Sequence, residues 1–341
     1  MSEATTNLAA ASTSAVKASP LAALKIGKIS AAKWRDIVLG TFIPCVGLVI
    51  FLLFWQVGSQ SIKTSLGTFP GPKEVYVQAG NMIVEYKEEK AREAAFYERQ
   101  AKRNEEALKA DPNAEIKKRE YNGRPTFFEK IKTSLVTVLS GFLIATLIAI
   151  PIGIVIGLSQ PLYQAFNPVI QIFKPVSPLA WLPLITLVVS SVYVSDAPMF
   201  SKSFIISLLT VSLCCMWPTM INTAVGVAGV SKDLVNVSRV LRLGWLTHVR
   251  KIVLPSSIPM MFTGLRLSLG IAWMVLIAAE MLAQNPGLGK FVWDEFQNGS
   301  SESLSRICVA VLTIGFIGFG LDRTLLLIQS YVNWDKSAVV R

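Results

Sequence analysis

The sequence predicts an all-α, polytopic membrane protein with about six transmembrane helices. Hydrophobic residues make up 52% of its 341 residues and charged residues only 16%, which is more apolar than a single soluble core requires. The apolar residues also stand in separated blocks of about 20 residues or more, the length with which a helix crosses the hydrocarbon of a bilayer. The predicted spans are about 37–57, 133–158, 167–193, 203–227, 257–283 and 305–330.

The formal net charge of +11 raises the alternative of a nucleic-acid-binding protein. Lys and Arg are also enriched in the cytoplasmic loops of membrane proteins, so membrane lipid is the expected partner and nucleic acid is not. His248 is the only histidine, and no cysteine pair has the spacing of zinc ligands or of a redox motif. No metal site and no catalytic site are therefore expected, and the chain is not expected to be an enzyme.

The distribution of Lys and Arg predicts how the spans are oriented in a bacterial inner membrane. An even number of crossings places both termini on one side, and the segments 1–36, 228–256 and 331–341 on that side carry five, five and two basic residues. The short connections on the other side carry only Lys202 and Lys290. Both termini are therefore expected in the cytoplasm.

These features divide the chain into five parts. They are a flexible cytoplasmic tail (1–36), a first span (37–57), a charged periplasmic insertion (58–131), a core of five spans with a cytoplasmic loop at 228–256 (132–330), and a cytoplasmic tail (331–341).

The insertion 58–131 departs from the charge rule, since it carries 14 basic residues on the side expected to be outside. Twelve acidic residues balance them, and loops longer than about 60 residues cross the membrane largely regardless of charge. Within it, Lys87 to Ala110 is rich in Glu, Lys, Arg and Ala, which predicts a polar helix stabilised by i,i+4 ion pairs. A solvated insertion and a docking surface for an external partner both remain open.

Four prolines interrupt the third span, 167–193. Each proline removes a backbone donor and clashes with the preceding turn, so a straight helix is not expected. Broken helices are tolerated in a membrane where the freed carbonyls are buried in protein or line a water-filled cavity. A packing kink without substrate contact is the alternative to a translocation pathway at this break. The candidate pathway residues here are Lys174, Pro175, Ser177, Pro178 and Trp181.

The most informative stretch runs from Asp233 to Pro255, in the loop predicted to be cytoplasmic. Leu234, Val237 and Val240 recur at helical spacing, and charged residues occupy the other faces. This pattern predicts a short amphipathic helix that can press into the groove of a partner.

This stretch resembles the coupling motif of ABC-importer permeases, in which Glu-Ala-Ala is followed by three residues, a Gly, nine further residues and then Ile-x-Leu-Pro. Two positions depart from the motif. Asn236 replaces the Glu, and Arg242 stands at the place of the Gly, with Gly244 two residues later and expected to end the helix. A helix lying in anionic lipid headgroups is the alternative for the same composition. By the resemblance, the residues that couple to the ATPase are Asp233, Asn236, Val237, Ser238, Arg242, Gly244, Ile252, Leu254 and Pro255.

The following run is similar to the nitrate, sulfonate and bicarbonate branch of these permeases, and the similarity covers about 132–330. It contains Phe262-Thr263-Gly264-Leu265-Arg266 and Ala278-Ala279-Glu280-Met281-Leu282. Within this branch, the stretch Lys174 to Pro183 and the Asn236 start of the coupling stretch look most like nitrate permeases. Nitrate or nitrite is therefore the expected substrate, with sulfonate or taurine and bicarbonate as alternatives.

The resemblance implies a type I ABC importer fold that works by alternating access, and it implies the partners. They are a second permease copy, expected to form a homodimer, cytoplasmic ATPases that bind ATP and Mg, and a periplasmic or lipid-anchored binding protein. The chain itself is expected to bind no cofactor, because Gly287-Leu288-Gly289-Lys290-Phe291 lacks the first glycine and the hydroxyl of a phosphate loop. A channel or an ion-coupled carrier is the competing class, but it predicts an internal repeat that the sequence does not clearly show.

Arg266, Trp273 and Glu280 are spaced by seven, so they share one face of a helix and drift by only about 20° per step. Ionisable groups on such a face should point into the bundle. In one interpretation Arg266 attracts a passing anion and Glu280 fixes the outer gate. In the other, both pair between helices or snorkel toward headgroups. Asp322 and Arg323 are expected to form a local charge pair.

Overall fold

The computed structural model describes residues 31–64, 67–110, 116, 118–194, 199–300 and 302–332. Of the two predicted tails, 1–30 and 333–341 lie outside the described residues, and 31–36 already belong to the first helix. The elements are α1 (Ala31–Ser61), β1 (Lys63–Thr64), β2 (Gly67–Thr68), α2 (Pro72–Ala110), α3 (Phe127–Leu158), α4 (Gln160–Phe173), α5 (Pro178–Val192), α6 (Lys202–Ala228), α7 (Lys232–Val240), α8 (Trp245–His248), a π-helical turn (Val249–Val253), α9 (Leu254–Ala283), α10 (Leu288–Asn298) and α11 (Ser303–Val332).

Among the described residues, five helical stretches are long and apolar enough to cross a membrane, and the bent pair α4–α5 adds a sixth if it forms one span. They coincide with the six predicted segments, which confirms the prediction of a polytopic all-α protein. α3 extends past its predicted start because polar residues cap it. Thr126 and Glu129 form a reciprocal capping box, so α3 begins six residues before the apolar block.

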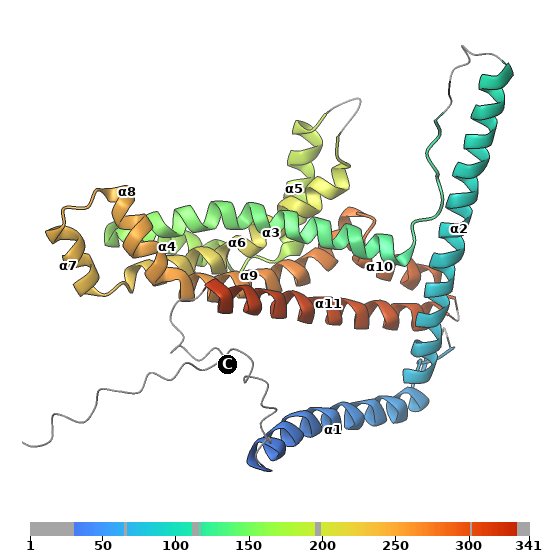
Figure 1. Ribbon diagram of the computed structural model, residues 1–341, viewed down its shortest axis with the longest axis horizontal. Coiled ribbons are helices and arrows are strands. Elements are labelled where there is room, and N and C mark those ends of the chain that lie inside the picture. Colours follow the sequence, from blue (N-terminus) through green and yellow to red (C-terminus); the bar gives the residue numbers. More distant parts are fainter. Residues whose placement is uncertain are drawn as a thin grey trace, which may run out of the picture. The chain divides into compact units, whose positions relative to one another are not determined.

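The third predicted span is broken, as its prolines indicate. α4 ends at Phe173, and Pro175 cannot supply the N–H that would continue it. α5 restarts at Pro178, with the Ser177 hydroxyl accepting a hydrogen bond from the backbone N–H two residues on at 3.3 Å. The two helices are bent by 96°, and Figure 1 shows α5 leaving the line of the neighbouring helices.

The helices α3, α6 and α9 pack side by side, and α11 packs against α9 (Figure 1). Two glycines on α3 allow the close approach of α6. A Cβ on Gly153 would lie 2.7 Å from the backbone oxygen of Met220, and one on Gly157 would lie 2.6 Å from that of Ala224. Backbone contact of this kind is how helices associate in a membrane, where the hydrophobic effect gives no net drive to bring them together.

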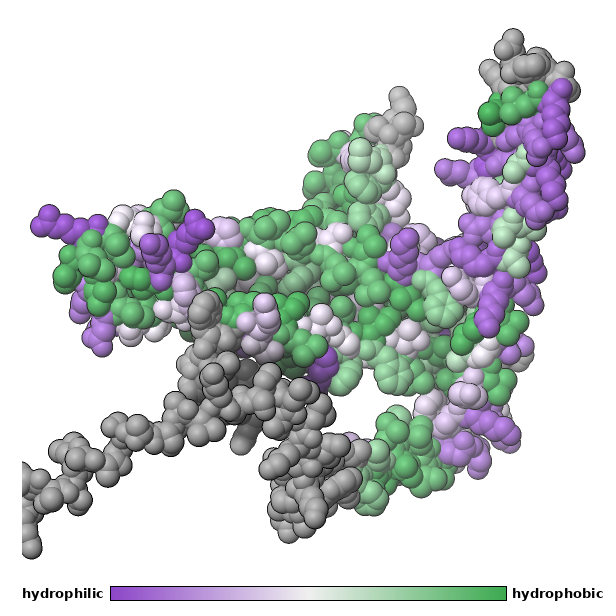
Figure 2. Space-filling model, in the orientation of Figure 1, coloured by the Kyte–Doolittle hydropathy of each residue, from purple (hydrophilic) through white to green (hydrophobic). Residues whose placement is uncertain are grey.

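The helix of the insertion is longer than predicted, because α2 starts at Pro72 rather than Lys87. Its outer part carries the expected i,i+4 ion pairs, such as Glu98–Lys102 with 2.7 Å between carboxylate and ammonium. The hydrogen bond between these two side chains lowers the pKa of Glu98 and raises the pKa of Lys102. Figure 2 shows polar residues along α2 and mainly hydrophobic surface over the bundle.

The inner part of α2 is tied to α11 by ion pairs. The guanidinium of Arg306 on α11 lies 2.8 Å from a carboxylate oxygen of Glu85 on α2 and 2.8 Å from one of Glu295 on α10. A second hydrogen bond to Glu85, at 3.0 Å, makes that pair bidentate. The insertion is therefore anchored at its base to the five-span core.

The helix α1 falls mainly in a separate unit of the chain and is described by itself. From Phe42 to Phe54 its described side chains are mostly exposed and apolar, and they show no polar face. A helix that is apolar all round is typical of a membrane span.

Candidate functional site

The α7–α8 unit, which we define as 232–253, is formed by two short helices and the wide turn that leads into α9. α7 begins after Ser231, whose hydroxyl accepts a hydrogen bond from the backbone N–H of Leu234 at 3.4 Å. Asp233 in the first turn favours the same helix end, since its negative charge lies near the partial positive charge of the helix N-terminus. The predicted amphipathic helix is therefore present.

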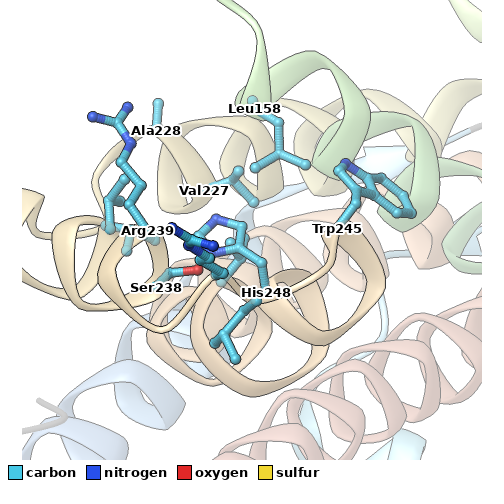
Figure 3. Close-up of a pocket in the computed structure, with 13 residues that line it drawn as sticks. Leu158, Val227, Ala228, Ser238, Arg239, Trp245 and His248 are labelled. Atoms are coloured by element: carbon cyan, nitrogen blue, oxygen red, sulfur yellow. The ribbon is translucent and has the colours of Figure 1, made fainter.

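A hydrogen bond holds α7 against α8. The hydroxyl oxygen of Ser238 lies 2.8 Å from Nδ1 of His248, and Figure 3 shows the two side chains pointing toward one another. Ser238 is buried, whereas Asn236 and Val237 before it are at least partly exposed. Of the three residues at the Glu-Ala-Ala place, two are therefore accessible to a partner and one fastens the unit internally. His248 is a residue of the unit that the motif did not single out.

α7 ends in a Schellman motif. The N–H of Leu243 donates to the carbonyl of Ser238 at 3.0 Å, and the N–H of Arg242 donates to the carbonyl three residues before it at 3.1 Å. This motif needs one residue in the left-handed region, and Arg242 occupies it with φ 48°. The prediction that Gly244 ends α7 is wrong, because Gly244 has an ordinary φ of −60° and is the N-cap residue of α8. The left-handed position coincides with the motif's glycine place, where this chain has an arginine.

The π-helical turn joins α8 to α9. The N–H of Leu254 donates to the carbonyl of Val249, five residues back, which is the wide π spacing. Pro255 accounts for this widening, because it has no N–H and its ring would clash with the carbonyl four residues before it. The helix nevertheless continues without a break from Trp245 to Ala283, and Ile252 lies within it. α8 and the α9 span are therefore parts of one continuous helix.

Large apolar side chains are exposed on the α7–α8 unit. Val240 is 81% exposed and Leu246 is 71% exposed. Exposed apolar groups gathered beside arginines are typical of protein–protein interfaces. Figure 2 shows hydrophobic surface around these two short helices, bordered by polar atoms. We call this set the α7–α8 patch: Val237, Val240, Leu241, Trp245 and Leu246.

A cavity of about 580 Å³ lies between the α7–α8 unit and the ends of α3 and α6 (Figure 3). Arg239, Arg242 and His248 contribute to its lining, and no carboxylate of the described residues does. The cavity is therefore electropositive, and the neighbouring patch combines an apolar centre with a positively charged border.

The residues predicted beside the helix break lie together between α4 and α5. Lys174 follows the last residue of α4, and Pro175 and Ser177 fill the turn. Trp181, in the first turns of α5, stacks on Phe173 with ring centroids 5.8 Å apart. Phe173 also stacks on Trp217 of α6, at 6.1 Å. Sequence reasoning missed Trp217, since only the fold brings α6 to the break.

Arg266 and Trp273 on α9 both bond to α11. The Arg266 guanidinium makes a bidentate pair with Asp322, with N–O distances of 3.0–3.3 Å. The indole N–H of Trp273 donates to the carbonyl of Ile314 at 3.0 Å. The prediction of a local Asp322–Arg323 pair is wrong, because Arg323 instead lies over the ring of Phe319, at 4.8 Å. The structure thus gives Arg266 a partner on another helix.

Glu280, the third member of the heptad line, contacts α3 and α10 instead of α11. Its carboxylate accepts hydrogen bonds from the hydroxyl of Ser134 at 2.8 Å and from the backbone N–H of Gly289 at 2.9 Å. The side chain has no exposed surface. The interpretation that it snorkels toward lipid headgroups is therefore wrong, and pairing between helices describes it.

Comparison with known proteins agrees with this architecture. Residues 149–331 match the model of the family described as the binding-protein-dependent transport system inner membrane component. A bicarbonate transport system permease protein of Synechococcus elongatus is 33% identical over 301 residues, covering 88% of this chain and 92% of that protein. A nitrate import permease protein of Leptolyngbya laminosa is 36% identical over 219 residues, covering 63% of this chain and 74% of that protein.

A solved structure supports the fold. An inward-facing structure of the MetNI methionine ABC transporter superposes with a TM-score of 0.52 at 12% identity, covering 60% of this chain and 95% of the matched chain. At this identity the likeness concerns the fold alone. The family match and the relatives establish that the chain belongs to the binding-protein-dependent transport system inner membrane components, which are the permease subunits of ABC importers.

Proposed function

We propose that the chain carries a small oxyanion inward across the membrane, with nitrate as the first candidate. Nitrate import permeases from Leptolyngbya laminosa and Synechococcus elongatus are 36% and 37% identical to it. Bicarbonate is the second candidate, because the bicarbonate permease of Synechococcus elongatus aligns over a longer part of the chain, 301 residues. Both anions are small, planar and singly charged, so one pathway chemistry can serve either.

The transport mechanism we propose is alternating access driven by ATPases that grip the α7–α8 unit. The observation that carries this proposal is the unbroken helix Trp245–Ala283, which joins that unit to a membrane span. Closure of the ATPases would displace the unit, and a rigid helix passes the displacement to α9. The Ser238–His248 hydrogen bond supports the same role, since it makes α7 move with α8.

The α7–α8 patch is the surface we propose for the ATPase. An apolar centre buried on docking would supply the affinity, and Arg239 and Arg242 at its border would select a groove that carries carboxylates. The residues proposed to couple the subunits remain Asp233, Asn236, Val237, Ser238, Arg242, Gly244, Ile252, Leu254 and Pro255. Within that set, we propose that Ser238 and Pro255 shape the unit. The accessible Asn236 and Val237 would contact the ATPase.

The complete importer we propose contains two copies of this chain as a homodimer, ATPases that bind ATP and Mg, and a periplasmic or lipid-anchored binding protein. The chain itself would perform no covalent chemistry and bind no cofactor. The basic residues of the α7–α8 unit would lie in the cytoplasm together with both termini, which follows from the positive-inside rule.

Reconstitution tests the proposal. The chain is co-reconstituted into proteoliposomes with its ATPase and binding protein, and uptake of labelled nitrate and labelled bicarbonate is measured with and without ATP. We expect nitrate to accumulate only when ATPase and ATP are both present. Uptake without the ATPase would assign the chain to the carriers or channels instead. Faster ATP-dependent uptake of bicarbonate than of nitrate would reverse the order of the two candidate substrates.

A further inference from the structure

Two buried indole N–H groups near the helix break have no hydrogen-bond partner among the described residues. They belong to Trp181 on α5 and Trp217 on α6. Buried polar atoms are nearly always paired, so an unpaired buried donor calls for an explanation such as a ligand, ion or water. Two such donors in one aromatic cluster make a ligand the explanation to test first.

The two indoles belong to one cluster, because the ring of Phe173 stacks on both. The ring centroids of Phe173 and Trp181 are 5.8 Å apart with 29° between the planes, and those of Phe173 and Trp217 are 6.1 Å apart with 7° between the planes. The three side chains come from α4, α5 and α6, so the cluster sits where the 96° bend opens the third span. We call Phe173, Trp181 and Trp217 the aromatic cluster.

The chemistry of the aromatic cluster restricts what it can bind. An indole N–H donates a hydrogen bond and cannot accept one, and a phenyl ring does neither in the ordinary sense. The side chains of the cluster therefore offer donors without a charge and without an acceptor. A ligand that matches them is an anion whose polar atoms are all acceptors.

Uncharged donors also suit a site on a transport route. Conduction requires an anion to be bound strongly enough to enter and weakly enough to leave. A fixed guanidinium in a low-dielectric interior would hold an anion much more tightly than two neutral N–H groups do. Arg266, the pathway candidate that could have supplied a guanidinium, is already paired with Asp322.

We infer that the aromatic cluster is a binding step for the transported anion, in which the indole N–H groups of Trp181 and Trp217 donate hydrogen bonds to oxygens of nitrate. This inference rests on the proposed function and deepens it. It also orders the two candidate substrates. All three oxygens of nitrate accept hydrogen bonds, whereas bicarbonate carries a hydroxyl hydrogen for which the side chains of the cluster supply no acceptor.

Replacing each tryptophan by phenylalanine tests the inference, because Trp181→Phe and Trp217→Phe remove the N–H and keep an aromatic ring for stacking. Trp293→Phe is the matched control, since Trp293 belongs to α10, and its ring lies 5.7 Å from that of Phe296 on the same helix, tilted by 32°. In the reconstituted importer we expect each cluster variant to lower the nitrate uptake rate about tenfold, the factor that one hydrogen bond to an anion accounts for. ATP hydrolysis stimulated by the binding protein should persist in these variants.

A direct measurement separates binding from packing. The complete importer is labelled with ¹⁵N-indole tryptophan, placed in nanodiscs and titrated with nitrate, and the variants assign the signals. We expect the Trp181 and Trp217 N–H resonances to shift with nitrate, to shift less with bicarbonate, and the Trp293 resonance to stay in place. Unmoved cluster resonances, or a loss of uptake equal in the control variant, would overturn the inference.

The outcome also distinguishes the two proposals. If wild-type importer accumulates nitrate and the cluster resonances stay unmoved, the aromatic cluster is not the site and the proposed function stands. If wild-type importer accumulates no nitrate under any condition, the proposed function fails first. If the indole N–H signals of Trp181 and Trp217 change only when the two permease copies are separated, the acceptors of these N–H groups lie on the second copy. That result would contradict the anion site.

Discussion

The hydroxyl of Ser134 on α3 lies 2.8 Å from both carboxylate oxygens of Glu280 on α9, and neither side chain has any exposed surface. The same hydroxyl oxygen accepts a hydrogen bond from the backbone N–H of Leu288 at 2.8 Å, and the N–H of Gly289 reaches Glu280 at 2.9 Å. Among the described residues, no lysine or arginine nitrogen lies within 4 Å of this carboxylate. The N-terminus of α10 provides the compensating partial positive charge.

The first prediction concerns Gly287, which packs directly against the Glu280 carboxylate. A Cβ at this position would overlap the carboxyl oxygens of Glu280, so Gly287→Ala must displace a buried side chain that is hydrogen-bonded on two sides. We expect the variant to lose roughly 1–3 kcal/mol of stability, the usual effect of overpacking, and to unfold at lower temperature in detergent. Gly270→Ala is the control, because nothing lies within 4 Å of its Cβ position and alanine favours a helix. Equal melting temperatures for the two variants would contradict the packing around Glu280.

The second prediction asks whether Arg266 serves structure or substrate. If it serves to pair α9 with α11, Arg266→Ala and Asp322→Asn should reduce uptake to a similar extent. The exchanged double variant Arg266→Asp/Asp322→Arg should then recover activity, with a coupling energy of roughly 0.5–3 kcal/mol. If Arg266 instead binds the substrate, Asp322→Asn should raise uptake, because this variant frees the Arg266 guanidinium for an anion. Undiminished uptake by Asp322→Asn would therefore show that the pair is dispensable.

The third prediction concerns the left-handed residue at the end of α7. Arginine at φ 48° is disfavoured relative to glycine by about 1 kcal/mol. Arg242→Gly should therefore slow hydrogen exchange of the α7 amides. Arg242→Asn, which also tolerates this conformation, serves to separate backbone strain from loss of charge. Faster exchange in Arg242→Gly would argue against the Schellman motif.

Gly244→Pro should leave the α7–α8 unit folded, because the φ of −60° at Gly244 is one that proline adopts.

The sequence predicts the spans well because each is a local property of about 20 residues. Hydropathy alone places α6 and α11 within a few residues, and the prolines between Phe173 and Pro178 suffice to predict the break. Helix ends are harder. The capping box at Thr126 extends α3 beyond its apolar block, and α2 begins well before its charge-rich stretch.

The partners of the charged residues could not be predicted, because they lie far apart in the chain. Asp322 has Arg323 beside it in sequence, yet it pairs with Arg266, 56 residues away. Ser134 and Glu280 are separated by 146 residues. Helical spacing correctly places Arg266 and Glu280 toward the protein interior, but only the packing of α3, α10 and α11 decides what each one meets.

The wrong helix end at Gly244 has a different cause. The expectation rests on glycine's freedom to adopt positive φ. The turn instead follows the register of the helix, which requires the left-handed residue at position 242 whatever its side chain. The resemblance to the coupling motif contains this information, since its glycine place coincides with Arg242.

We propose that a nucleotide-driven subunit grips the α7–α8 patch, and site-specific photocrosslinking can detect this contact. In one variant a photoreactive phenylalanine replaces Val240 in the patch. In a second variant it replaces Met199, which is 85% exposed and precedes the N-terminus of α6, whereas the patch follows the C-terminus of α6. The assembled importer is irradiated in membranes, and its products are identified by mass. If the ATPase grips this patch, position 240 forms a crosslink to the ATPase and position 199 forms none. A crosslink to the ATPase from position 199, or labelling of position 240 by a membrane-impermeant reagent added outside intact cells, would contradict it.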